Sequence, residues 1–413
     1  MSFPLRNVLA VIAVAVFYTN WPDYAHTRLG ILVPYYWVLG FGVLSLPFLF
    51  RQIVASDMLK SPVVIWCFGY AWLTIVWFVG STQSEIAWQV VRWRFLAIIE
   101  LLLFISLFSN QEANRRARQV LVAGVAAGVI IQIYELFFPM SFSEVLGRSA
   151  GLYMNPNMAG SALVFGMICA VTVLPLRYRV GFLLMSGIGV LASFSRGSIL
   201  AWGIAVGGLA VTGLIRAKDF AITGLLAFGL LLLMVVPNWN AFLSTLERAG
   251  SINRNVEERL AWLTDPSGVS DESSWSRQYL VKRAWDKIEE RPFWGGGTGS
   301  SFETDIAPHN QSLVFMQDHG VLGILILPLL LLSVVLSATV ENRRTAVVFG
   351  CTLMLGSLFS HSLLNDPPIL LIFALIATMG AAKPGGVSES ERGWGATASP
   401  RLASPPDSIS SNM

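Results

Sequence analysis

Long apolar segments alternate with short polar ones along most of this chain. About twelve of them approach the length at which a helix crosses the roughly 30 Å of hydrocarbon in a bilayer. The pattern predicts helices near residues 5–19, 31–50, 61–80, 92–108, 119–138, 157–175, 180–195, 197–215, 219–236, 309–339, 345–360 and 366–381. No small-residue cleavage site follows the first segment, so we interpret it as a span and not as a signal peptide.

Composition agrees with a membrane class. Hydrophobic residues make up 54% of the 413 positions and charged residues only 13%, which is typical of integral membrane proteins. Cys67, Cys169 and Cys351 lie far apart inside apolar segments, so they indicate neither a disulfide framework nor a metal site. We therefore expect an all-α integral membrane protein of about 12 transmembrane helices, with one large outer loop segment that contains amphipathic helices.

Basic residues are distributed unevenly between the two sets of connecting loops. With the amino terminus inside, one set holds fifteen Lys and Arg residues, whereas the short loops of the other set hold five. Because Lys and Arg in short loops stay on the cytoplasmic side, this bias predicts that both termini are cytoplasmic. We expect a polytopic membrane domain over residues 1–382, a large outer segment within it at 237–308, and a disordered cytoplasmic tail at 383–413.

The outer segment contains the pattern of a surface helix and a run of glycines. Between Trp275 and Ile288, apolar residues recur at helical spacing among basic ones, which predicts an amphipathic helix at the membrane surface. The run "GGGTG" at 295–299 lies in no strand–helix unit and no Walker lysine follows it, so we interpret it as a tight backbone turn. Eight basic residues face eleven acidic ones in this segment, so an anion that binds there needs particular arginines.

Two arginines depart from the charge pattern. Arg148 and Arg196 lie in short outer loops, in "GRSAGLYMNPNMAG" and "SFSRGSILAW". A charge at the membrane interface is costly unless it is paired or faces water, which favours a functional site. Snorkelling of the side chain to the lipid headgroups is the structural alternative.

Other charged residues near the ends of spans have simpler interpretations. Arg92 and Arg94 open a span and are expected to snorkel, while Glu100 and Glu135 are candidates to pair with the outer arginines. Asp366 suits the N-terminus of the last span. The outer side has no "DxD" carboxylate pair that would hold a divalent cation between phosphates, which counts against metal-dependent sugar transfer.

The segment "PHNQSLVFMQDHGVLG", residues 308–323, places a histidine at the mouth of an apolar run. If its proline opens a helix, Gly320 and Gly323 fall within about 40° of His309 on a helical wheel. Small residues on that stripe would let another helix or a lipid-linked ligand pass beneath His309. On the same wheel His319 points away from this stripe. A histidine at the water boundary can act as an acid or a base, although a polar helix end is the alternative interpretation.

These segments are similar to those of a known family. The spacing His309-Asn310, nine residues, Gly320, two residues, Gly323 resembles the His-Asn/Ser/Gln, nine, Gly-x-x-Gly signature of the bacterial O-antigen ligase family, within the wider ligase and polymerase superfamily. The segments "SRQYLVKRAWDKIEERPFWGGGTGSSF", "RSAGLYMNPNMAG" and "SFSRGSILAW" resemble that superfamily's Arg-Trp-Pro-Gly-x-Gly, Arg-x-x-Gly…Asn-Pro-Asn and Ser-Arg-Gly segments. The resemblance covers roughly residues 140–360, and the first 140 residues match only in hydropathy.

The resemblance implies roles for particular residues. Such proteins transfer a glycan from undecaprenyl diphosphate to a sugar hydroxyl at the periplasmic face of the bacterial inner membrane. His309 corresponds to the catalytic histidine, and Arg148, Arg196 and Arg277 correspond to diphosphate-binding arginines. The remaining motif residues expected at the substrate are Asn155, Asn157, Asn310, Gly320 and Gly323. Because arginine supplies fixed, bidentate positive charge, we expect no metal and no cofactor.

The resemblance thus implies a metal-independent inverting glycosyltransferase, foremost an O-antigen ligase that uses the lipid A core of lipopolysaccharide as acceptor. The alternatives are an O-antigen or exopolysaccharide polymerase of the same superfamily, a protein O-oligosaccharyltransferase and a lipid-linked oligosaccharide flippase. A flippase should show repeat symmetry and ionisable residues near the midplane, and the sequence shows neither. The expected partners are the undecaprenyl-diphosphate-linked glycan donor, a lipid A core or glycan acceptor and membrane lipids, with no nucleic acid.

Overall fold

The computed structural model describes residues 3–54, 58–145, 147–235, 244, 272–303 and 307–380. The side chains of a few residues in these ranges, Arg277 among them, lie outside the description. Throughout the described ranges the regular elements are helices and none is a strand. The expected all-α membrane architecture is therefore confirmed at this level.

Each of the predicted apolar segments contains a helix. The first half of the chain holds α1 (Phe3–Ala13) with its π-helical continuation η1 (Val14–Tyr18), α2 (Trp21–Leu29), α3 (Pro34–Val54), α4 (Pro62–Val79), α5 (Glu85–Phe108) and α6 (Gln111–Phe137). The second half holds η2 (Gly151–Tyr153), α7 (Pro156–Ala170), η3 (Val171–Val173), α8 (Leu176–Ala192), α9 (Arg196–Val211), α10 (Ala217–Val235), α13 (Glu272–Glu290), η4 (Ser300–Phe302), α14 (Gln311–His319), η5 (Gly320–Leu322), α15 (Gly323–Ser337), α16 (Arg343–Gly356) and α17 (Pro367–Ala377).

Fewer of these helices than expected can cross a bilayer by themselves. Five segments of the described chain are long and apolar enough, and a sixth is added if the pair Leu5–Tyr18 and Trp21–Leu29, bent by 51°, forms one span. The expected count of about twelve is therefore not confirmed. One reason is length, since α9 has 16 residues and α17 has 11. Charge is the other reason, because Arg92, Arg94 and Glu100 all lie within α5.

Polar side chains cap the starts of several helices. The Ser84 hydroxyl accepts a hydrogen bond from the Ala87 backbone N–H at the start of α5. Asn155, Ser195 and Asn310 cap α7, α9 and α14 in the same way. These caps satisfy backbone N–H groups that have no partner inside the helix, and they fix where each of the four helices begins.

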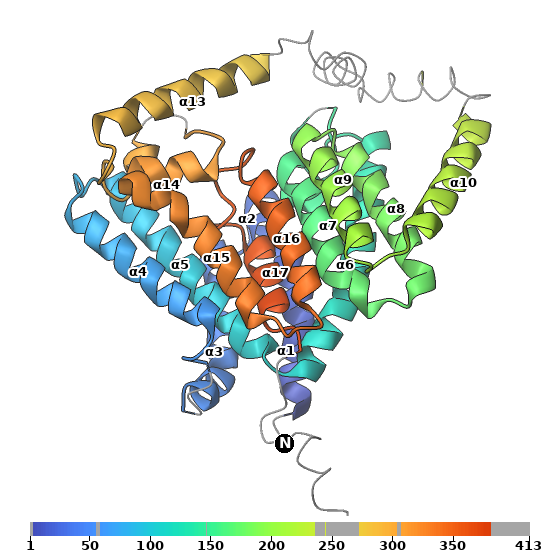
Figure 1. The fold of residues 1–413 in the computed structure, drawn as a ribbon, viewed down its shortest axis with the longest axis horizontal. Coiled ribbons are helices and arrows are strands. Elements are labelled where there is room, and N and C mark those ends of the chain that lie inside the picture. Colours follow the sequence, from blue (N-terminus) through green and yellow to red (C-terminus); the bar gives the residue numbers. More distant parts are fainter. Residues whose placement is uncertain are drawn as a thin grey trace, which may run out of the picture. The chain divides into compact units, whose positions relative to one another are not determined.

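Helices α7 and α17 lie at the centre of the core. Nearly every residue of each is buried, and α17 contacts α5, α7 and α15. Figure 1 shows α16 and α17 beside α7, and the contacts among the three helices agree with this view. The connection between α16 and α17 is thereby brought to the beginnings of α7 and α9.

Helix α13 lies where the sequence predicts an amphipathic helix, and its position at a membrane surface stays a prediction. Leu280, Ala284 and Ile288 are buried on one stripe, and the last two pack with Leu313 of α14. The loop that follows contains three glycines with positive φ, at +66° for Gly295, +92° for Gly297 and +94° for Gly299. The tight turn expected of "GGGTG" is therefore present, because such φ values favour glycine.

The loop closes around a buried ion pair that we had not expected. The Arg94 guanidinium forms a salt bridge with the Asp318 carboxylate and lies 2.8 Å from His319 Nε2. Asp318 also accepts hydrogen bonds from the backbone N–H groups of Gly299 and Ser301. The expectation that Arg94 snorkels is wrong, because α14 and the glycine loop provide partners that make burial of its charge tolerable.

Glu135 also departs from expectation. Its two carboxylate oxygens accept hydrogen bonds from the backbone N–H groups of Phe142, Ser143, Ala150 and Gly151. The expected pairing with an outer arginine is therefore wrong for this residue. Instead, the carboxylate holds the ends of the connection that leads from α6 to α7.

Candidate functional site

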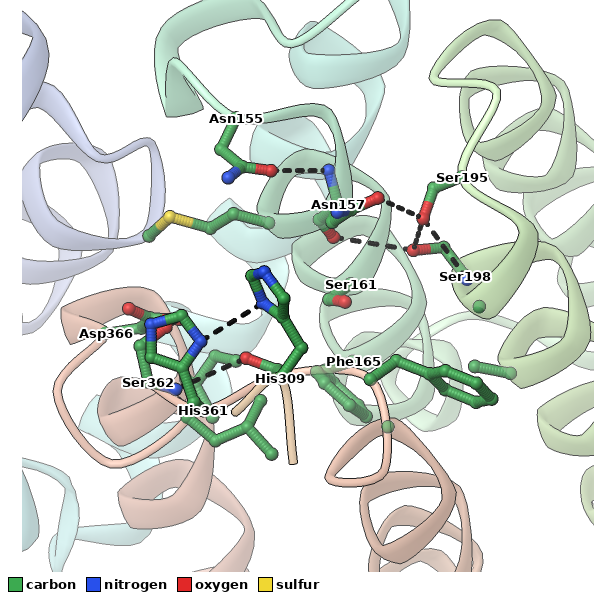
Figure 2. Close-up of a pocket in the computed structure, with 18 of the residues that line it drawn as sticks. Asn155, Asn157, Ser161, Phe165, Ser195, Ser198, His309, His361, Ser362 and Asp366 are labelled. Carbon is green, nitrogen blue, oxygen red and sulfur yellow. Dashed lines mark hydrogen bonds between the residues drawn. The ribbon is translucent and has the colours of Figure 1, made fainter. Parts of the chain in front are cut away.

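A cavity of about 120 Å³ lies between the starts of α7 and α9, the segment before α14, and the connection from α16 to α17. Its lining joins residues that are far apart in the sequence (Figure 2). Four of the predicted site residues line it: Asn155, Asn157, Arg196 and His309. The α16–α17 connection adds Phe359, Ser360, His361, Ser362, Leu363 and Asp366.

The Asn-Pro-Asn segment forms the start of α7. Asn155 caps the helix by accepting a hydrogen bond from the Asn157 backbone N–H, and Pro156 occupies the first turn, where its missing N–H costs nothing. The Asn157 side-chain oxygen accepts from Arg148 Nη2 at 3.0 Å and from Ser195 Oγ at 3.0 Å. Asn155 thus determines where α7 begins, and Asn157 connects Arg148 to the cavity wall.

The Ser-Arg-Gly segment forms the start of α9. Ser195 caps the helix, and Arg196 is its first residue and lines the cavity. The two helix starts pack closely, because a Cβ at Gly160 would lie 2.7 Å from Ser198 Cβ. Two helix N-termini and Arg196 therefore surround one cavity, which favours an anion there.

His309 lies two residues before α14, in contact with a second histidine. Its Nδ1 is 3.2 Å from Nδ1 of His361, so one ring donates the shared proton and the other accepts it. Burial, together with the neighbouring His309, lowers the pKa of His361 to about 4. His361 is therefore neutral at neutral pH and can accept the proton of the pair. Figure 2 shows His309 between His361 and the side of the cavity formed by Asn157 and Ser195.

Asp366 lines the same cavity and does not simply cap the last helix. No side-chain cap bond joins it to α17, and its carboxylate accepts a hydrogen bond from Ser362 Oγ at 3.3 Å. Burial raises the pKa of Asp366 to about 7. Near neutral pH this carboxyl therefore carries much less negative charge than an exposed aspartate.

The helical wheel drawn from His309 to Gly323 is wrong. Helix α14 begins at Gln311, after its cap Asn310, so His309 lies outside the helix. The helix ends before Gly320, whose φ of +63° and ψ of −151° break the turn. Gly320 and Gly323 do not line the cavity. A Cβ at Gly320 would overlap the Phe293 carbonyl, and one at Gly323 would overlap the Phe315 carbonyl. These two glycines permit close backbone packing at the break.

The other predicted residues lie in different places. Arg148 does not line the cavity. Its guanidinium donates hydrogen bonds to the Ser193 carbonyl and to Asn157, and Asn157 does line the cavity. Asn310 caps α14, and its side-chain oxygen accepts from the Ser312 and Leu313 backbone N–H groups. The side chain of Arg277 lies outside the described part of the chain.

Sequence reasoning missed His361 as a partner of His309. His361 lies in the segment "HSLLNDPP", and no fixed spacing connects it to residue 309. Asp366 was assigned only to a helix end. The presence of both residues in one short connection that also carries three serines was the available signal.

Comparison with known protein families bears on this site. The family model described as O-Antigen ligase matches residues 180–328. The matched range contains Arg196, Arg277 and His309 and ends before His361. No curated protein matches the chain. Over residues 180–328 the chain is therefore similar to the O-antigen ligase family, the family that its sequence motifs predicted.

Proposed function

We propose that this chain is a metal-independent inverting glycosyltransferase that moves a glycan from undecaprenyl diphosphate to a sugar hydroxyl. The acceptor we propose is the lipid A core of lipopolysaccharide, which makes the reaction O-antigen ligation. The observation that carries the proposal is that His309 lines one cavity together with Arg196 and the starts of α7 and α9. A potential base and a site for an anion are thus adjacent.

The donor's diphosphate fits the cationic side of this cavity. As the glycosidic bond breaks, negative charge increases on the leaving phosphate oxygen, and preorganised donors stabilise it. Arg196 and the N-termini of α7 and α9 supply such donors at the cavity wall. We assign Arg277 to the same diphosphate from its sequence motif, and we assign Arg148 the role of positioning Asn157.

His309 is the proposed base, and its neighbour determines which nitrogen acts. When neutral His361 accepts the proton on His309 Nδ1, the lone pair of His309 lies on Nε2. The acceptor's O–H then gives its proton to Nε2, and its oxygen forms a bond to the anomeric carbon. The bond from that carbon to the phosphate oxygen breaks, and undecaprenyl diphosphate leaves with the electron pair. A single in-line displacement inverts the anomeric centre.

The proposed orientation follows from the distribution of charge. We place both termini in the cytoplasm, residues 237–308 in the periplasm and the site at the periplasmic face of the inner membrane. Support comes from the excess of Lys and Arg in one set of loops. Most of residues 237–271 and all of the proposed tail at 383–413 lie outside the described chain.

A strain that lacks this chain tests the function. Loss of core-linked glycan together with accumulation of long lipid-linked chains is expected of a ligase. A core capped by a single repeat unit would instead indicate a polymerase of the same superfamily. Purified protein should join donor and acceptor in EDTA, and strict dependence on added Mg²⁺ or Mn²⁺ would contradict the metal-independent mechanism.

Arg196→Lys should weaken donor binding. Lysine keeps the charge but loses the planar fork that can bind two phosphate oxygens, so a loss of about 1–3 kcal/mol is expected. The donor concentration for half-maximal rate should then rise roughly fivefold to 150-fold. The matched control is Arg177→Lys, which changes an exposed arginine at the start of α8. If both variants have the same donor concentration for half-maximal rate, Arg196 does not bind the diphosphate.

Asp366→Asn should change the pH dependence of donor binding. Because the pKa of Asp366 is raised to about 7, its carboxyl is mainly neutral below pH 7 and becomes charged above it. The negative charge then repels the diphosphate, so the donor concentration for half-maximal rate should rise several-fold from pH 7 to pH 8 in the unsubstituted protein. In Asp366→Asn it should stay constant. If the donor concentration for half-maximal rate rises equally in the unsubstituted protein and in Asp366→Asn, another group is responsible for the pH dependence.

A further inference from the structure

A second cavity adjoins the first. Its volume is about 320 Å³, at the lower end of the roughly 300–1,000 Å³ typical of small-molecule pockets. His361 and Ser362 line both cavities. The rest of the second lining consists of Trp93, Leu96, Ala97, Glu100, Phe302 and Asn365.

Glu100 is the unusual residue of this lining. Its side chain belongs to α5 and the residue is only 4% exposed, yet no described group forms a hydrogen bond with its carboxyl. The expected pairing of Glu100 with an outer arginine is absent from the described chain. A buried carboxyl without a partner costs free energy, and an ionisable residue within a predicted span marks a functional site by default.

Aromatic rings line the cavity beside this carboxyl. The rings of Trp93 and Phe302 pack edge to face, with 5.9 Å between their centroids. The centroid of the Phe302 ring lies 6.3 Å from that of the His361 ring. His361 in turn lies 5.0 Å from the His309 ring, so a row of rings leads from Trp93 to the proposed base. Such walls accommodate the C–H faces of a sugar ring by apolar contact.

The polar groups of the second cavity suit hydroxyls better than phosphates. Of the described residues that line it, none is Lys or Arg. Glu100, Asn365 and Ser362 offer hydrogen-bonding oxygens and an amide, which are the partners that hydroxyl groups need. The two cavities therefore differ in chemistry, with the cationic groups at the first.

We propose that the second cavity binds the acceptor sugar, with Trp93 and Phe302 against its ring and Glu100 on its hydroxyls. The inference rests on the proposed glycosyl transfer and assigns its second substrate. A sugar held there presents a hydroxyl beside His361, next to the cavity of the donor. Acceptor specificity then depends on α5 and η4, outside the segments that carry the family motifs.

The experiment uses the full-length protein in lipid nanodiscs. Undecaprenyl-linked glycan and lipid A core, both extracted from a strain that lacks this chain, serve as donor and acceptor. Initial rates are measured for Trp93→Ala and Glu100→Leu while each substrate is varied in turn. Trp72→Ala on α4 and Glu112→Leu on α6 are the matched controls, because Trp72 is exposed, the Glu112 side chain is 39% exposed, and neither residue lines either cavity.

We expect both cavity variants to raise the acceptor concentration for half-maximal rate by about tenfold, with the donor value unchanged. Unchanged acceptor values, or a rise in the donor value, would overturn the acceptor assignment while leaving the proposed transfer intact. Absence of transfer by the unsubstituted protein would overturn both proposals. If Glu100→Leu does not fold, Trp93→Ala decides, since Trp93 is 39% exposed and its truncation leaves no buried charge.

Discussion

His309→Ala should bind the lipid-linked donor normally and transfer almost no glycan. A positioned base contributes typically 10²–10⁴-fold to a rate, so a loss of that order is expected. Donor affinity should persist, because Arg196 and the starts of α7 and α9 remain in the cavity wall. The measurements are donor binding to protein in nanodiscs and the rate of transfer at saturating donor and acceptor.

A control on another histidine separates chemistry from general damage. His26 is exposed on α2, so His26→Ala should retain full activity. His361→Ala should show a smaller loss than His309→Ala, because it removes the partner that sets the tautomer and leaves the base in place. Normal transfer by His309→Ala would refute the assignment of the base.

Arg94→Ala should strongly destabilise the protein. The Arg94 and Asp318 side chains are 4% and 0% exposed, so truncating the arginine leaves a buried carboxylate whose charge is uncompensated. Breaking a buried ion pair in this way costs about 3–5 kcal/mol. The expected result is a large fall in the thermal unfolding midpoint, followed by tryptophan fluorescence, together with loss of activity.

An exposed ion pair provides the comparison. Arg116 pairs with Glu112 one turn away on α6, with side chains 53% and 39% exposed. Arg116→Ala should cost about 0.5 kcal/mol or less, because water screens such pairs. Similar unfolding midpoints for Arg94→Ala and Arg116→Ala would show that the buried pair contributes little to stability. His319 belongs to the same network, and because it is a fully buried partner of Arg94, its removal should also destabilise the protein.

Helix positions could be predicted because apolar length is a local property. Every predicted apolar segment contains a helix, and helical spacing located α13. The number of spans could not be predicted in the same way, because it depends on where each helix ends and on the charges inside it. Pro367–Ala377, for example, ends four residues before its predicted end, and α5 contains three charged residues within its apolar part.

The site was predictable where motif residues start helices. Asn157, Arg196 and His309 come from three separate segments, and the structure brings all three to one cavity. Their local patterns contain capping residues, whose chemistry can be recognised without the fold. The wheel failed because it assumed one continuous helix, whereas Gly320 adopts a backbone conformation that ends α14.

Contacts between residues far apart in the sequence could not be predicted. Arg94 has its ion-pair partner 224 residues away, and Glu135 uses backbone groups that carry no sequence signal. His361 lies 52 residues from His309 without a motif to connect them. Each of these contacts depends on how helices pack, which hydropathy alone does not determine.

The division between the two cavities has a consequence for the order in which donor and acceptor bind. His361 and Ser362 line both cavities, yet the remaining residues of each lining are different. Donor and acceptor that occupy separate cavities can be bound at the same time, so neither needs to leave before the other arrives. The reaction then passes through a ternary complex and does not follow the alternating, ping-pong scheme of enzymes that carry the transferred group on their own side chain.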